Sequence, residues 1–179
     1  MIDQIEQRRD KSSRFLRWAA IAFAIGFSVH GVDHLRRGMS ASPPFIMVAG
    51  TVQGLFVVLT VAMVLRHRPR APLAAVGVGL GGALGFTYAH LLPTFVPGYQ
   101  DSFISPPHIN VTWFSWFSAL AEIGTGIIFG IAGMQEVSSV RNPLLRWHLR
   151  NVHQIRGFDS EAQSDGRPAD RTAAGPGSR

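Results

Sequence analysis

The stretch from His30 to Gly38 holds the side chains best suited to chemistry, namely two histidines, one aspartate and two arginines. His30 and His34 are four residues apart, so a helix places them one turn apart on the same face. Neutral imidazoles with a nearby carboxylate, here Asp33, are common ligands of zinc, copper, nickel or iron. The spacing therefore favours a metal site, or else a buried polar network, at this place in the chain.

The elements that must position these side chains are apolar segments of about 18 to 23 residues, each long enough as a helix to cross a hydrocarbon core of roughly 30 Å. We therefore predict an all-α fold, a bundle of four transmembrane helices within residues 15–135. The first span is short of apolar residues and must include His30 to cross the bilayer, while Arg36 and Arg37 are expected to extend to the headgroups. The four segments are Trp18–Leu35, Pro44–Leu65, Pro72–Leu92 and Val111–Gly133.

Charge sets the expected orientation. The chain has 17 Lys and Arg against 11 Asp and Glu, a net charge of +6. The basic residues flank the apolar segments, which is typical of cytoplasmic loops rather than of a nucleic-acid surface. We expect a multi-pass protein of a bacterial plasma membrane with both termini in the cytoplasm, residues 1–14 as a cytoplasmic tail, and loops 36–43 and 93–110 outside. The absence of cysteine excludes disulfides and thiolate metal sites.

With this orientation, polar side chains gather in the outer halves of the spans. Glu122 lies about eleven residues into the fourth segment, near the middle of the bilayer, and must be protonated or paired there. Gln53 and His90 lie in the second and third segments. The candidate metal ligands are His30, Asp33, His34, His90 and His108, and the candidate pocket or network residues are Gln53, Tyr88, Ser118 and Glu122.

The third segment also carries glycine at every fourth position, at Gly77, Gly81 and Gly85. Such a stripe lets helix backbones approach closely in lipid, so we expect it to pack against a neighbouring helix. His90 is nine residues from Gly81 and points almost the opposite way on an ideal helix.

Three interpretations of the polar cluster compete. The first is an outward-opening pocket that binds a transition-metal ion or a small ligand. The H-x-x-D-H spacing is similar to the His-and-Asp motif of nickel permeases, although their His–Asp spacing is longer and they have more helices. The second is haem b, with His30 and His90 as axial ligands. The third is a structural or accessory membrane protein whose buried network stabilises the bundle. With no nucleophile–base pair and no phosphate loop, the sequence favours binding over catalysis.

The C-terminal part is expected to serve the membrane surface. Apolar side chains within Arg141–Ile155 have helical spacing, so we predict that residues 136–156 form a short cytoplasmic amphipathic helix that contacts the bilayer through Arg146, Trp147 and Arg150. Residues 157–179 are polar and rich in Gly, Pro and Ser, and we expect them to be disordered. Expected partners are the lipid bilayer and a second copy or another membrane protein, and not nucleic acid.

Three segments, His30–Gly38, Ala89–Pro93 and Leu120–Ile123, together resemble a family of small four-helix integral membrane proteins of actinobacteria. The resemblance covers most of residues 15–135. It implies a four-helix fold and a membrane location, and no particular activity.

Overall fold

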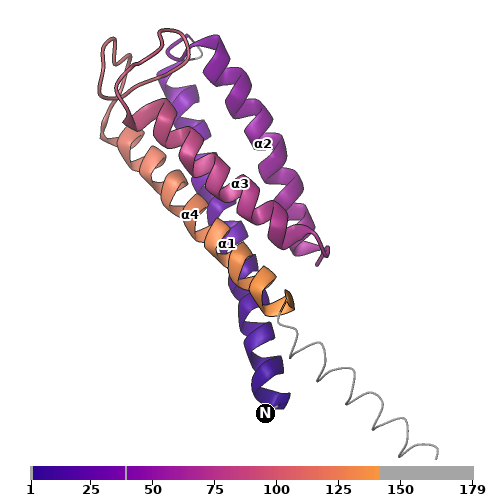
Figure 1. Ribbon diagram of the computed structural model, residues 1–179. Coiled ribbons are helices and arrows are strands. Elements are labelled where there is room, and N and C mark those ends of the chain that lie inside the picture. The colour runs from indigo at the N-terminus through magenta and orange to yellow at the C-terminus, as the bar shows by residue number, and fades with distance from the viewer. Residues whose placement is uncertain (1, 39, 142–179) are drawn as a thin grey trace, which may run out of the picture. The chain divides into compact units, whose positions relative to one another are not determined.

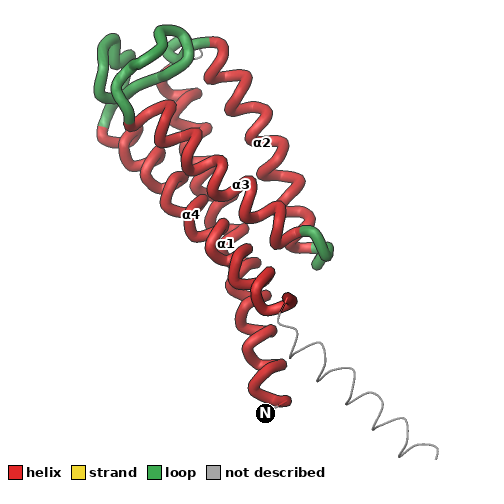
Figure 2. Tube along the Cα trace, in the orientation of Figure 1, coloured by secondary structure: helices red, strands yellow, loops and turns green. Residues whose placement is uncertain are grey.

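The computed structural model describes residues 2–38 and 40–141, and within them all regular structure is helical. This confirms the predicted all-α class for the described part of the chain (Figures 1 and 2). The elements are α1 (Ile2–Arg37), α2 (Pro44–Leu65), α3 (Ala71–Phe86), a π-helical turn η1 (Thr87–Leu91) and α4 (Trp113–Arg141).

Four stretches within these elements are long and apolar enough to cross a membrane, as the sequence predicts. Their bounds are Asp10–Arg37, Pro44–Leu65, Ala71–Leu91 and Trp113–Ser139.

The helices extend beyond the predicted bundle at both ends. The expected tail, residues 1–14, is described from Ile2 onward as the beginning of α1. The predicted amphipathic segment, residues 136–156, continues α4 as far as Arg141. Its remaining residues, including Arg146, Trp147 and Arg150, lie outside the described residues together with the predicted disordered tail.

The bundle places small and aromatic side chains inside and large apolar side chains outside. Phe23 and Phe129 are fully buried, with ring centroids 5.4 Å apart. Trp18, Leu84 and Trp113 are at least 70% exposed. Such an outer surface would be costly in water and is favourable in contact with lipid. The packing thus fits helices that cross a membrane.

Close packing of α3 against α4 uses a different stripe from the one expected. In the described part of the chain, a Cβ added at Gly77, Gly81 or Gly85 would meet nothing within 4 Å, so the prediction that these glycines pack against a neighbouring helix of the bundle is wrong. The contact face is offset from that stripe and includes Gly79 and Ala83, which lie against Gly126, and Leu80, which lies against Gly130.

Gly79 shows why this face needs a glycine. A Cβ there would lie 2.6 Å from the carbonyl oxygen of Gly126 and 2.7 Å from the amide nitrogen of Gly130, both backbone atoms of α4. The two backbones therefore touch at a small-residue contact of the kind that holds membrane helices together. Both stripes have the same four-residue period, and only the packing selects between them.

One end of the bundle collects the end of α1, the beginning of α2, η1 and the beginning of α4 (Figure 1). The long loop between η1 and α4 lies at this end, drawn in green in Figure 2. Its residues 100–103 are buried and bond to the helix end. The Asp101 amide donates to the Ala89 carbonyl at 3.0 Å, and the Phe103 amide donates to the His90 carbonyl at 2.9 Å. These bonds satisfy carbonyls that the end of a helix leaves free.

Candidate metal centre

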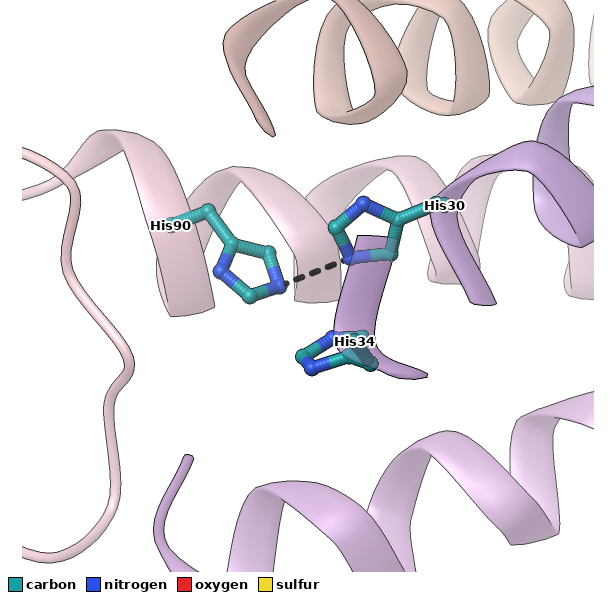
Figure 3. Close-up of side chains that lie close together, drawn as sticks. All are labelled: His30, His34 and His90. Atoms are coloured by element: carbon teal, nitrogen blue, oxygen red, sulfur yellow. Dashed lines mark hydrogen bonds between the residues drawn. The ribbon is translucent and has the colours of Figure 1, made fainter. Parts of the chain in front are cut away.

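Three of the predicted ligands meet in the fold. One ring nitrogen from each of His30, His34 and His90 lies within 4.8 Å of the other two (Figure 3). The Nε2 atoms of His30 and His90 are 3.2 Å apart. His30 is 2% exposed and His90 is fully buried, while His34 is partly buried. The i, i+4 spacing on α1 and the position of His90 on η1 thus bring three imidazoles together.

Local structure explains this convergence. On α1, His30 and His34 are one turn apart, with ring centroids 4.7 Å apart. The wider π-helical turn changes the direction of His90 from that of an ideal α-helix. Its ring then packs between Phe86, at 6.1 Å between centroids, and Phe103, at 4.7 Å. The aromatic contacts hold the third imidazole against the other two.

The hydrogen bonds of His90 fix which of its nitrogens carries the proton. Its Nδ1 lies 3.0 Å from the main-chain carbonyl oxygen of Asp101. A carbonyl oxygen can only accept, so Nδ1–H is the donor. A neutral ring then has its lone pair on Nε2, the atom that faces His30.

The proton of neutral His34 also lies on Nδ1, and the side chain of Asp101 determines this through Ser42. Burial alone would raise the pKa of this carboxyl, but hydrogen bonds from Arg37 and Ser42 outweigh burial and hold its pKa below the ordinary value. Asp101 is therefore a carboxylate, and the Ser42 hydroxyl donates to its Oδ2 at 2.6 Å. Since that proton is used, the Ser42 oxygen accepts from His34 Nδ1 at 3.0 Å. His34 also keeps its lone pair on Nε2.

His30 has two possible arrangements, set by the hydroxyl of Ser118. If this hydroxyl donates to the Ser115 carbonyl, at 3.0 Å, it accepts from His30 Nδ1, at 3.2 Å. The lone pairs of His30 and His90 then face each other, and a metal cation between them would stabilise this arrangement. If Ser118 instead donates to His30 Nδ1, His30 Nε2–H donates to His90 and the network closes without a metal.

The separation of the two Nε2 atoms fits a small metal ion better than haem. Two ligands of tetrahedral zinc, each at about 2.0–2.1 Å, lie about 3.3 Å apart. The observed 3.2 Å is close to this value. Two histidines that bind a haem iron from opposite faces need about 4 Å between their ligating nitrogens, and the porphyrin lies between the two imidazole rings. His30 and His90 leave no such space.

Residues that the sequence analysis did not assign to the site hold it in place. Arg37 forms a two-pronged ion pair with Asp101, through distances of 2.7 and 2.8 Å. The expectation that Arg37 extends to the headgroups is wrong, because this buried carboxylate binds it and leaves it 3% exposed. The available signal was Asp101 itself, the only acidic residue in a long loop without Lys or Arg.

Two predicted ligands lie apart from the three histidines. The Oδ1 of Asp33 accepts from Arg36, at 2.8 Å, and from Ser115, at 3.1 Å. His108 is exposed on the long loop, with a positive φ of 45°.

The predicted network residues surround the cluster to different degrees. Ser118 contacts His30, and the nearer carboxyl oxygen of Glu122 lies 4.0 Å from His30 Nε2. Gln53 donates to the Val78 carbonyl at 3.1 Å, farther along α2. Tyr88 is half-exposed, 39%, on η1.

A cavity of about 500 Å³ adjoins the cluster between α1, α2, α3 and η1. His30, His34 and His90 line one part of it, and most other lining residues are apolar or glycine. Gly81 and Gly85, where an added Cβ would meet no described atom within 4 Å, belong to this lining. Their missing side chains leave the space beside the histidines open.

No family model matches this chain. Neither the curated proteins nor the solved structures compared with it include a match. The resemblance to small actinobacterial four-helix proteins therefore rests on the three quoted segments alone.

Proposed function

We propose that this protein is a membrane protein that binds one divalent transition-metal ion at His30, His34 and His90. The observation that supports this most is the convergence of three imidazoles within 4.8 Å. The Nδ1 atoms of all three contact protein oxygens, from Ser118, Ser42 and Asp101 respectively. Metal-bound histidines commonly donate their second ring N–H to a carbonyl or another oxygen, which fixes the ring and its tautomer.

The donor set favours zinc, copper, nickel or iron over calcium and magnesium. Neutral imidazole nitrogen suits these transition metals, whereas calcium and magnesium prefer oxygen ligands. The described residues supply three nitrogen donors in a buried place. The adjoining cavity offers the ion, or a small ligand of the ion, a way to the cluster.

We place the protein in a bacterial plasma membrane, with the metal site near the outer surface. Support comes from charge. Arg66, Arg68 and Arg70 lie in the loop between α2 and α3, at the opposite end from the histidines, and the loop 93–110 beside them has no Lys or Arg. The metal would then arrive from outside the cell.

A structural role is the second candidate, and the hydrogen bonds of His30 are what favour it. When the Ser118 hydroxyl donates to His30 Nδ1, His30 Nε2–H donates to His90 and His90 Nδ1–H donates to the Asp101 carbonyl, so these hydrogen bonds are complete without any ion. Such a network would stabilise the end of the bundle and bind nothing.

Metal binding to the purified protein separates the two. We expect the protein, stripped with a chelator and then titrated with Zn²⁺, to bind one ion per chain. His34→Ala should abolish this binding, and it is the best variant because His34 is the least buried of the three. His67→Ala and His108→Ala, both at exposed histidines, are matched controls that should bind normally.

The outcomes are distinct. If the native protein binds no Zn²⁺, Cu²⁺ or Ni²⁺ and His34→Ala only lowers thermal stability, the structural role is correct. An absorption spectrum of the same sample tests haem, since a Soret band would contradict the metal-ion proposal.

A further inference from the structure

Glu122 is a buried carboxyl group without a partner beside the histidine cluster. It lies on α4 and is 1% exposed. Neither of its side-chain oxygens has a hydrogen-bond partner among the described residues. Its Oε2 lies 4.0 Å from His30 Nε2, the same nitrogen that faces His90.

Such a group is costly in a membrane helix bundle, because it gives up hydration and gains no bond in return. The other buried carboxylates near this end are bound by arginine. Arg36 donates to Asp33, and Arg37 donates to Asp101. Among the described residues near the cluster, Glu122 is thus the buried carboxyl left available for a cation.

Packing of α1 against α4 brings Glu122 to this position. A Cβ at Gly26 would lie 2.6 Å from Thr125 Oγ1 and 3.3 Å from the Cα of Glu122. Since Gly26 is one turn before His30 on α1, the close approach of the helices places Glu122 next to that histidine. A larger residue at Gly26 would push the carboxyl away from the cluster.

We propose that Glu122 is the fourth ligand of the metal ion, so that the complete site consists of three histidines and one glutamate. This inference rests on the proposed function of the histidine cluster. Ligand atoms of a tetrahedral ion lie about 3.3 Å apart, so the present 4.0 Å separation between Oε2 and His30 Nε2 has to shorten by less than about 1 Å. A side-chain rotation covers such a distance.

Charge supports the same assignment. Three neutral imidazoles leave the full charge of a divalent ion in a low-dielectric interior, where unpaired charge is costly. A carboxylate ligand offsets half of that charge. It also explains why a glutamate, rather than an apolar residue, lies at a helix contact where none of the described protein groups bonds to its side chain.

The test compares Zn²⁺ affinity of the full-length native protein with that of Glu122→Gln, which keeps the shape and removes the charge. We expect the affinity to fall at least about 100-fold. Mutation of a residue that only hydrogen-bonds to a metal ligand lowers affinity by up to about 100-fold, and loss of a ligand itself should cost at least as much. Glu136→Gln, on the same helix and away from the cluster, is the matched control and should bind as the native protein does. Glu122→His should retain binding, because it returns a donor atom to the same place.

X-ray absorption at the zinc edge gives an independent measurement. The native site should contain three nitrogen ligands and one oxygen ligand, and the Glu122→His site should contain four nitrogens. If Glu122→Gln binds Zn²⁺ with native affinity while His34→Ala does not, Glu122 is not a ligand and the histidine site stands. If the native protein binds no metal, both proposals are wrong.

Discussion

Arg37 and Asp101 form a buried ion pair across 64 residues of sequence, with each guanidinium Nη atom donating to a different carboxylate oxygen. The same aspartate accepts from Ser42 through its side chain and from His90 through its main-chain carbonyl. The end of α1, the segment just before α2 and the turn η1 are thereby joined at one loop residue. This arrangement sets the direction of two of the three histidines.

Breaking the ion pair should destabilise the protein strongly. Asp101→Asn leaves the buried Arg37 without a counter-charge, and removal of one partner of a buried pair costs about 3–5 kcal/mol. Chemical unfolding in detergent micelles measures the change. Asp10→Asn, at an exposed position on α1, should change the free energy of unfolding by less than about 0.5 kcal/mol. Equal effects of the two variants would contradict this role of Asp101.

The contribution of Asp101 should depend on pH in a defined direction. Its pKa in the folded protein lies below the ordinary value of 3.8. The stabilisation is therefore fully present above about pH 3.8 and is lost as the pH falls through the lower, folded value. We expect the stability difference between the native protein and Asp101→Asn to be constant between pH 5 and 7, within roughly 0.5 kcal/mol, and to shrink below about pH 4. A difference that grows on acidification would reverse the assigned sign.

Ser42 should matter to metal binding without touching the metal. Ser42→Ala removes the oxygen that accepts from His34 Nδ1 and so frees this ring to rotate or to change tautomer. Loss of such a supporting contact typically costs about 10–100-fold in metal affinity. Zn²⁺ titration measures it, with Ser40→Ala, at an exposed serine two residues earlier, as the control. Native affinity in Ser42→Ala would show that His34 needs no support.

The two glycine stripes of α3 should respond in opposite ways to alanine. Gly79→Ala places a Cβ 2.6 Å from a backbone oxygen of α4 and should destabilise the bundle by about 1–3 kcal/mol, as overpacking does. Gly81→Ala meets nothing within 4 Å and should be neutral or slightly stabilising, because alanine favours a helix. Thermal unfolding of both variants checks this. If Gly81→Ala were the more damaging, the stripe at Gly77, Gly81 and Gly85 would form a contact outside this chain.

Reporter fusions test the proposed orientation. Alkaline phosphatase, which is active only outside the cytoplasm, should be active when fused after Arg37 and inactive when fused after Arg68. The reverse result would place the histidine cluster on the cytoplasmic side and end the proposal that metal arrives from outside. It would leave the metal site itself untouched.

The sequence was sufficient to predict the four helices and the end of the bundle at which His30, His34 and His90 lie. Length and apolar composition determine a membrane-crossing helix locally, so the four spans agree with the elements of the fold. Consecutive spans cross the membrane in opposite directions, so the first and third spans end on the same side of it. His30 and His90, near those two ends, are therefore expected on the same side. The i, i+4 spacing of His30 and His34 fixes their common face. These properties depend on neighbours within a few turns, which a sequence shows directly.

Tertiary structure decided everything that depends on how the elements meet. Both glycine stripes of α3 repeat every four residues, and only packing against α4 selected Gly79. The direction of Arg37 depended on Asp101, in a loop whose path no local pattern gives. The direction of His90 depended on a π-helical turn and on the loop that bonds to it. Contacts between distant segments follow from the packing of the whole bundle, and for that physical reason the sequence located the candidate ligands but not the residues that orient them.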